Sequence, residues 1–165
     1  MKPEELSEQL REGQGGFLGR RRKIAGLALA AAGSMDLISL YQTGVIKSLP
    51  DPPLPYFDSE KVNAGAEAYS RLSMPDAPLG LGSYAATLGL AAMGGEARAS
   101  ERPWVPLALA AKVLADAAQA GKLTVDQWTK HRAFCVWCLI AAGATFAAVP
   151  LAVPEARAAL RNVRT

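Results

Sequence analysis

Residues 134–153 read FCVWCLIAAGATFAAVPLAV, an apolar run that contains both cysteines of the chain, Cys135 and Cys138. As a helix this run is about 30 Å long, which matches the hydrocarbon thickness of a bilayer. Half of the 165 residues are hydrophobic, and alanine, glycine and leucine supply most of them. Small residues allow helices to pack closely in lipid. The run therefore predicts a membrane-spanning helix within a bundle.

Three further apolar segments lie upstream, at residues 24–46, 77–95 and 104–121. The first follows the basic run RRRK at residues 20–23, and it is too long and starts too late for a cleavable signal peptide. Four such segments with short links predict an all-α integral membrane bundle of four transmembrane helices. The chain then divides into a polar tail (1–23), a transmembrane domain (24–154) and a basic tail (155–165).

Positive charges predict the orientation of this bundle. Arginine and lysine are more frequent on the side that holds both termini, at residues 20–23, 98, 102, 157, 161 and 164. That bias places both termini in the cytoplasm and Cys135 on the oxidising side. We expect a multi-pass protein of the bacterial plasma (inner) membrane. A basic run directly before an apolar span is typical of a topology signal and lipid contact, so no nucleic-acid partner is predicted.

The outer loop, residues 48–76, is rich in proline. Within it, Val62, Ala66, Tyr69 and Leu72 recur at helical spacing. The run 59–72 therefore predicts a short amphipathic helix on the outer surface, with Asp58 or Ser59 capping its start. Such a loop is either a connector or a lid over a lipid-facing cavity.

The spacing of Cys135 and Cys138 lets their sulfurs approach on the first turn of a helix. The positive end of that helix favours a thiolate at Cys135, which makes it the better nucleophile and Cys138 the resolving or buried partner. His131 either assists this thiolate or is incidental. Two further ligands for zinc are missing, so no metal site is predicted. A structural disulfide and two inert thiols stay open beside the favoured interpretation, a redox-active pair that a membrane quinone oxidises.

Several stretches of the chain resemble one family when they are read in order. These are SLYQTG at 39–44, FDSEKVNAGAEAY at 57–69, PDAPLGLGSYAA at 75–86 and FCVWCLIAAGATFAAVP at 134–150. Together they resemble the vitamin K epoxide reductase family, whose bacterial members are quinone-linked disulfide-forming enzymes. The resemblance covers about residues 20–155. It implies that Cys135 and Cys138 are the membrane-embedded redox pair, with Cys138 next to the quinone ring.

The loop departs from the family pattern, which usually has a cysteine before a valine and a serine shortly after. Ser59 or Asp58 stands where that cysteine is expected, and Ala64 or Gly65 where the serine is expected. The loop cysteines of the family relay electrons from a thioredoxin-like partner by thiol–disulfide exchange, and a serine cannot do so. Either a partner dithiol reaches Cys135 directly, which is the favoured expectation, or the electrons come from another donor, or the redox function is lost while the fold remains.

The predicted function is a membrane thiol–disulfide oxidoreductase that passes electrons from a dithiol donor through Cys135 and Cys138 to a quinone of the menaquinone or ubiquinone type. The donor would be a thioredoxin-like protein on the outer face. Phe134, Trp137 and Tyr84 are candidate quinone contacts, or else interfacial aromatic residues.

Charges inside the predicted spans suggest a second site. Asp36 and Lys112 lie near mid-depth, which predicts an intramembrane ion pair that Asp116 could share. Two other classes of function stay open. One is a non-catalytic membrane interaction module or an inactive homologue that retains the fold, and the other is a small carrier that uses Asp36 and Lys112.

Overall fold

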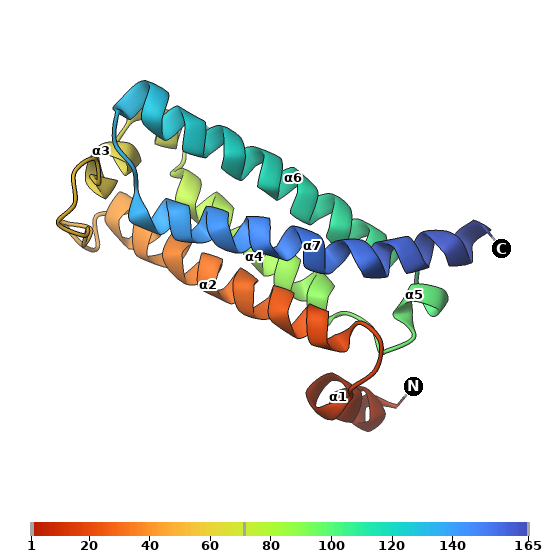
Figure 1. The fold of residues 1–165 in the computed structure, drawn as a ribbon. Helices are drawn as coiled ribbons and strands as arrows, with labels where there is room; N and C mark the ends of the chain where they lie inside the picture. Colours follow the sequence, from red (N-terminus) through yellow and green to blue (C-terminus); the bar gives the residue numbers. More distant parts are fainter. Residues whose placement is uncertain (1, 71, 165) are drawn as a thin grey trace.

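The computed structural model describes residues 2–70 and 72–164 as a bundle of long helices (Figure 1). Successive long helices run in opposite directions, and their bounds are α2 (Leu18–Gln42), α4 (Asp76–Ala92), α6 (Trp104–Asp126) and α7 (Val136–Arg164). The shorter elements are α1 (Pro3–Glu12), α3 (Ser59–Asn63), the 3-10 helix η1 (Ala66–Tyr69), α5 (Arg98–Glu101) and the π-helical turn η2 (Gln127–His131). Within the described residues, extended backbone pairs only at an isolated bridge between Phe57 and Phe134. The predicted all-α class is thus confirmed.

Both termini lie at one end of the bundle, here called the termini end, and α3 lies at the other, here called the α3 end (Figure 1). Two helices are long and apolar enough to cross a membrane, Leu18–Gln42 and Val136–Val163. Of the remaining long helices, α4 is shorter, and α6 carries Lys112, Asp116 and Lys122. Length and composition therefore support two spans directly.

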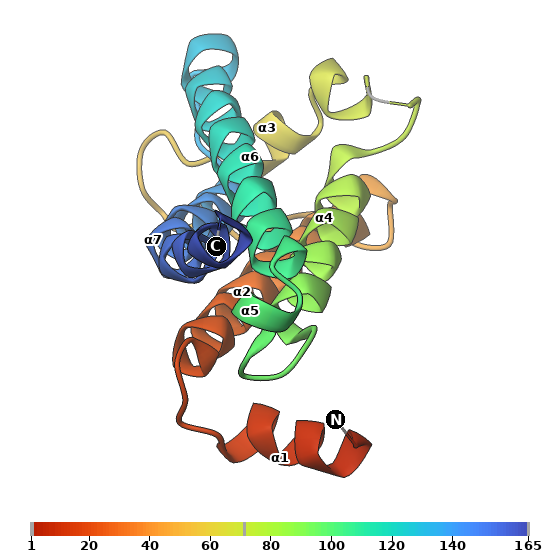
Figure 2. The same ribbon diagram turned by 90° about the vertical axis from the view of Figure 1, so that its right-hand side faces the viewer.

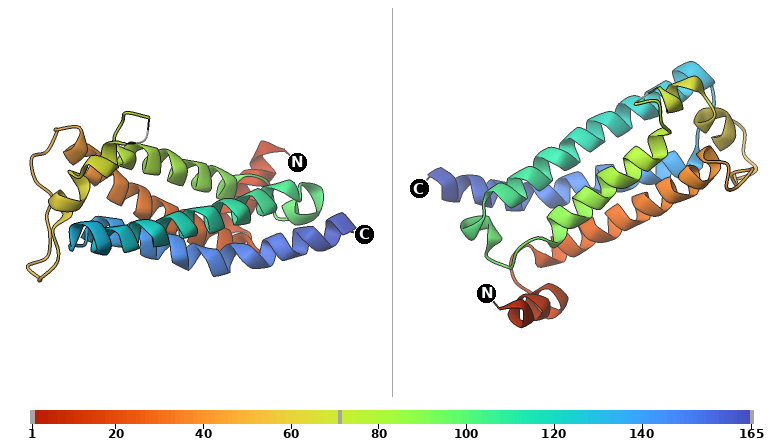
Figure 3. Two further views of the ribbon diagram at one scale, coloured as in Figure 1. Left: turned by 90° about the horizontal axis from the view of Figure 1, so that it is seen from above. Right: turned by 180° about the vertical axis from the view of Figure 1, so that it is seen from behind.

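The bundle core consists mainly of small residues. Helix α2 packs against α4 and α7, while α6 packs mainly against α7 (Figure 2). Seen from behind, α4 lies between α2 and α6 (Figure 3). Ala31 of α2 meets Ala141 and Ala144 of α7 in one core cluster, and Ile24 and Leu109 lie in another. Alanine on both sides of the α2–α7 contact lets the two backbones approach closely, as the composition predicted.

The helices extend beyond the apolar runs that predicted them. Helix α2 begins at Leu18, so the RRRK run at 20–23 is helical, and α1 occupies part of the predicted polar tail. Helix α7 continues through Pro150 and Pro154 into the segment predicted as a basic tail, of which residue 165 lies outside the described residues. Apolarity indicates where a chain meets lipid, whereas a helix can continue into water as long as its backbone hydrogen bonds do.

The predicted loop helix over 59–72 is wrong as a continuous element. Helix α3 ends at Asn63, η1 follows, and Arg71 lies outside the described residues. The expected apolar face is not the buried one, because Leu72 is 82% exposed while Ser59 and Asn63 are buried. The predicted cap is confirmed, since the Lys61 backbone N–H donates to Asp58 Oδ1 at 2.8 Å. The buried face of α3 is polar because it meets polar groups of the bundle, as described below.

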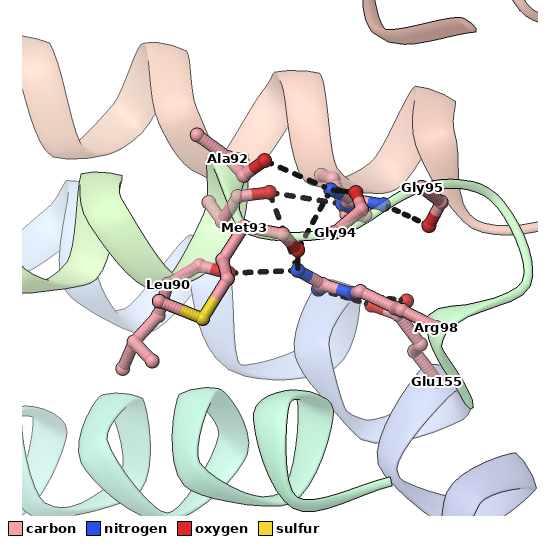
Figure 4. Close-up of polar contacts among 9 residues, drawn as sticks. Leu90, Ala92, Met93, Gly94, Gly95, Arg98 and Glu155 are labelled. Carbon is pink, nitrogen blue, oxygen red and sulfur yellow. Dashed lines mark hydrogen bonds and ion pairs between the residues drawn. The ribbon is translucent and has the colours of Figure 1, made fainter. Parts of the chain in front are cut away.

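At the termini end, the buried guanidinium of Arg98 joins three helices (Figure 4). Its Nε and Nη2 donate to the two carboxylate oxygens of Glu155 on α7, at 2.7 and 2.6 Å. Its Nη1 donates to the backbone carbonyls of Leu90 and Met93 at 2.7 and 2.8 Å. Carbonyls of the last helical turn have no partner within their own helix, so Arg98 satisfies groups at the end of α4 that would otherwise be buried without one.

Arg21 of α2 completes this contact with the same end of α4. It donates to the carbonyls of Ala91, Gly94 and Gly95 at 2.9, 2.7 and 3.0 Å. Gly94 has a φ of +80°, and a Cβ there would lie 3.2 Å from the Cβ of Arg98. Glycine is therefore needed where the chain turns from α4 toward α5. The sequence analysis treated Arg21 and Arg98 as topology charges only, and their buried role was not predicted.

Removing Glu155 tests the contribution of this buried pair to stability. In Glu155→Ala the Arg98 guanidinium stays buried without its counter-charge, and we expect the free energy of unfolding to fall by about 3–5 kcal/mol. Thermal unfolding in detergent, followed by tryptophan fluorescence, measures the change. The control Glu101→Ala removes an exposed carboxylate and should change stability by less than about 0.5 kcal/mol. Equal losses in the two variants would contradict the assignment.

Candidate functional site

The two cysteines meet where α7 begins, at the α3 end of the bundle. Cys135 directly precedes α7 and is fully buried, whereas Cys138, on the first turn, is partly exposed. Both thiols are free, and the Cys138 backbone N–H donates to Cys135 Sγ at 3.1 Å. The Cys135 backbone N–H donates to Gln127 Oε1 at 2.8 Å, which fixes the chain just before the helix. The structure thus places the two sulfurs together at the helix start.

Asn63 of α3 contacts both sulfurs, as a donor to one and as an acceptor from the other. Its Nδ2 donates to Cys135 Sγ at 3.2 Å, while the Cys138 thiol donates to its Oδ1 at 3.8 Å. The same Nδ2 lies 2.7 Å from the carbonyl of Ser59, so the amide is held within its own helix. A hydrogen-bond donor stabilises a thiolate and an acceptor stabilises a thiol. Asn63 therefore favours charge on Cys135 and a proton on Cys138.

Cys135 lies outside the span formed by α7, and its surroundings favour its ionised form. The pKa of Cys135 falls from its ordinary 9.0 to about 7, chiefly because of its hydrogen bond with the Cys138 side chain, although burial opposes this shift. The Ser59 side chain, the Cys138 backbone and the Asn63 amide act in the same direction. A large fraction of Cys135 is therefore thiolate near neutral pH, which is the form that takes part in thiol–disulfide exchange.

Helix α3 is held over the cysteines by contacts on two sides. Gln42, the last residue of α2, donates from Nε2 to Asp76 Oδ1 at 2.8 Å and to the carbonyl of Asn63 at 3.3 Å. On the other side, the Asp58 backbone N–H donates to the Phe134 carbonyl at 3.0 Å, and the Phe134 N–H donates to the Tyr56 carbonyl at 2.7 Å. The loop thus covers Cys135 and connects α2, α4 and the start of α7.

The three predicted quinone contacts do not line one cavity. Phe134 belongs to the cover and stacks on Trp128, with ring centroids 5.5 Å apart. Trp137 packs beside the cysteines, and its Nε1 donates to the Pro50 carbonyl at 3.0 Å. Tyr84 lies deeper in the bundle, with its hydroxyl 3.0 Å from Thr145 Oγ1. Tyr84 lines a cavity of about 10 Å³, which holds roughly one water molecule rather than a quinone head.

The charged residues in the spans pair differently from the prediction. Lys112 forms its ion pair with Asp116 and donates to Ser83 Oγ at 2.8 Å, while Asp36 lies exposed on α2. The predicted pair of Asp36 and Lys112 is therefore replaced by a pair within α6. Residues four apart on one helix are already neighbours, and α2 packs mainly against α4 and α7.

His131 also lies away from the reacting sulfurs. Its Nε2 is 4.0 Å from a carboxylate oxygen of Glu67 in η1, and a Cβ on Gly65 would lie 2.8 Å from its ring. Of the two interpretations left open for His131, the structure supports contact with the loop rather than with Cys135.

Several residues of this site were not predicted from the sequence. Asn63 and Gln127 contact Cys135, and Gln42 positions α3. Gln42 and Asn63 occur in segments read for their apolar pattern, and Gln127 lies between two predicted spans. A usable signal was present in SEKVN, where Ser59 and Asn63 stand four apart and must share a helix face. The apolar spacing of Val62, Ala66, Tyr69 and Leu72 predicted that a different face of this helix is buried.

These features define a class, a helical membrane protein with a thiol pair at the start of a span and a loop helix covering it. A family model described as the vitamin K epoxide reductase family matches residues 23–153. The chain belongs to this family. No curated protein and no solved structure matches the chain. Family members are membrane-embedded oxidoreductases of thiol–disulfide chemistry, which associates this chain with that activity in general.

The ionisation of Cys135 gives a prediction with a definite sign. In the reduced protein, alkylation of Cys135 by iodoacetamide should be slow below pH 7, where the thiol is protonated, and reach half of its plateau rate near pH 7 instead of 9.0. Asn63→Leu removes a donor and should move this midpoint upward. Mass spectrometry of each cysteine measures the rates, and Lys61→Ala, exposed on the same helix, is the control. A wild-type midpoint at the ordinary value would refute the assignment.

Proposed function

We propose that this chain is a quinone-linked thiol–disulfide oxidoreductase with Cys135 and Cys138 as its redox pair. The observation that supports it most is the contact of two free thiols at the start of a membrane-spanning helix, with donors directed at one sulfur. In the oxidised protein, a donor thiolate attacks Cys135 Sγ, the bond between the two cysteines breaks, and Cys138 leaves as a thiolate. The second donor thiol, after losing its proton, then displaces Cys135, which leaves a donor disulfide and a reduced pair.

The acceptor of the two electrons is, in this proposal, a membrane quinone of the menaquinone or ubiquinone type, which takes up two electrons and two protons as it becomes a quinol. The fit rests on the surroundings of Cys138, which packs with Trp137 against the buried apolar side chains of Ile38 and Ala77. Phe134 and Tyr84 are retained as further candidate contacts. Because the bundle interior is closed, we place the ring against the partly exposed Cys138 from the lipid side.

The loop 48–76 acts as a lid in this proposal. Cys135 is 0% exposed beneath α3, so a macromolecular donor needs the lid to open before it can attack. The contacts of Gln42 with Asn63 and of Phe134 with Tyr56 and Asp58 would have to break. These are hydrogen bonds of modest net strength in a short loop, so opening is compatible with an intact bundle. The donor would be a thioredoxin-like dithiol protein on the outer face.

We further propose that α2, α4, α6 and α7 all cross the membrane, as residues 24–154, with the α3 end outside and both termini in the cytoplasm of a cell bounded by a plasma (inner) membrane. Both termini at one end require an even number of crossings (Figure 1). The arginines at 20–22, 98, 102, 157 and 161 gather at that end, which agrees with positive charge inside. Pairing of Lys112 with Asp116 lowers the cost of placing α6 in lipid.

A second candidate function is that of an inactive homologue or a membrane interaction module that retains the fold. Full burial of Cys135 and a serine at the loop position expected for a cysteine favour it. Unchanged function in a variant with alanine at both cysteines would select this candidate over the enzyme.

Thiol labelling tests whether quinone oxidises the pair. In membranes reduced with dithiothreitol and then washed, both cysteines should react with maleimide after the protein is unfolded. Adding a short-chain quinone should abolish labelling of both cysteines together, because a disulfide forms. Cys138→Ser is the control and should keep Cys135 labelled. A wild-type pair whose labelling is independent of quinone would refute the redox proposal.

The order of attack gives a second test. In Cys138→Ser, Cys135 is first converted to its mixed disulfide with thionitrobenzoate. A thioredoxin-like protein with a single attacking cysteine should then release thionitrobenzoate, seen by its absorbance, and stay linked to Cys135. The matched variant Cys135→Ser, treated alike, should release it at least about tenfold more slowly, since Asn63 offers Cys138 Sγ an acceptor rather than a donor. Equal rates would contradict the assigned roles.

A further inference from the structure

Asp51 holds the buried hydroxyl beside Cys135. Its Oδ1 accepts from Ser59 Oγ at 2.6 Å, and its Oδ2 accepts from the Ser59 backbone N–H at 2.6 Å. Ser59 is 0% exposed and shares a partner with Cys135, because Asn63 Nδ2 donates to the Ser59 carbonyl at 2.7 Å and to Cys135 Sγ at 3.2 Å. The Ser59 side chain also lowers the pKa of Cys135. Asp51 itself is only partly buried. A continuous row of polar atoms thus connects the buried sulfur with the surface of the loop.

We propose that Asp51 accepts the proton of Cys135 through the Ser59 hydroxyl, an inference that rests on the proposed redox function. The S–H bond of Cys135 breaks as its proton moves to Ser59 Oγ, and the original hydroxyl proton of Ser59 moves to Asp51 Oδ1. The products are a Cys135 thiolate, an intact serine hydroxyl and a protonated Asp51. The carboxylic acid then gives its proton to water at the surface of the loop.

The chemistry of the three groups suits this transfer. A serine hydroxyl has one donor hydrogen and two acceptor lone pairs, so Ser59 can accept from a thiol while it donates to a carboxylate. A separation of 2.6 Å is typical of an O–H donor on an ionised carboxylate. The second hydrogen bond, from the Ser59 backbone, fixes the carboxylate in the plane needed to receive the proton.

Other titratable groups around α3 have different partners. Asp58 accepts from the Lys61 backbone, Glu60 from the Leu49 backbone at 3.1 Å, and Asp76 from Gln42. On η2 and η1, His131 faces Glu67. Among the described residues, Asp51 is the carboxylate that bonds the hydroxyl reaching Cys135.

A purely structural role for Asp51, in which it only anchors the loop to α3, makes a different prediction. Asparagine can keep both contacts, because its amide oxygen accepts from the Ser59 N–H and its amide nitrogen donates to Ser59 Oγ. It cannot accept a proton. Asp51→Asn therefore separates anchoring from proton transfer, and Ser59→Thr keeps a hydroxyl that Ser59→Ala removes.

The test measures a single turnover that needs no donor protein. Full-length protein in liposomes is reduced, mixed with a short-chain ubiquinone and quenched with maleimide, and the loss of free thiols gives the oxidation rate. We expect Asp51→Asn and Ser59→Ala to oxidise at least about tenfold more slowly than wild type, the lower part of the range for general base catalysis. Ser59→Thr keeps the hydroxyl and should oxidise faster than Ser59→Ala. Asp58→Asn, which keeps the cap of α3, is the matched control and should also be unchanged.

Rescue by an external base distinguishes a chemical role from a structural one. The rate of Asp51→Asn should rise with the concentration of imidazole buffer, while that of wild type should not. Wild-type rates and no buffer dependence in Asp51→Asn would overturn the relay and leave the redox function standing. A slow Asp51→Asn without rescue would show a structural role and also overturn the relay. A wild-type pair that quinone does not oxidise would end both proposals.

Discussion

A buried thiol ionises only where hydrogen-bond donors replace the water that it has lost, because desolvation favours the neutral form. Cys135 receives such hydrogen bonds from the Cys138 backbone and from Asn63. Asn63 belongs to α3, a helix too short to be stable by itself. The contacts of Gln42 and of the bridge at Phe134 are therefore needed to keep α3 where Asn63 meets the sulfurs.

At the termini end, side chains from other helices likewise supply hydrogen bonds to buried groups, here to backbone carbonyls. Helix α4 ends in a buried turn, and the guanidinium groups of Arg21 and Arg98 satisfy its last carbonyls (Figure 4). Between the two ends the core consists of small apolar side chains. Alanine packing alone specifies the relative register of the helices weakly, so the polar contacts at the two ends define it. Helices α4 and α6 pack less extensively against each other than α2 packs against α4 and α7.

The sequence predicted those features that depend on local pattern. Helical periodicity, small-residue content and the spacing of Cys135 and Cys138 act over a few residues, and the structure shows four long helices with the two sulfurs together. The contacts that were predicted wrongly or not predicted depend on which elements pack against each other. Lys112 could pair with Asp36 or Asp116 as far as composition tells. It pairs with Asp116, its neighbour on α6, because α2, which carries Asp36, packs mainly against α4 and α7. From the sequence, Arg98 is predicted to be a topology charge, whereas the structure pairs it with Glu155.

The position of the proton acceptor bears on how electrons and protons separate. On the proposed topology, Cys135 delivers its proton through Ser59 toward the α3 surface, while Cys138 packs beside Trp137 against the apolar side chains of Ile38 and Ala77. The quinone then takes two electrons from the pair but only the Cys138 proton directly, and its second proton comes from water. Because the Asp51 route lies at the α3 end, this arrangement returns the Cys135 proton to the side from which the donor dithiol arrived. A loop cysteine could not provide such a route, since its thiol exchanges covalently with Cys135. The serine at position 59 is thus better explained as a change in what the loop transfers, from electrons to a proton.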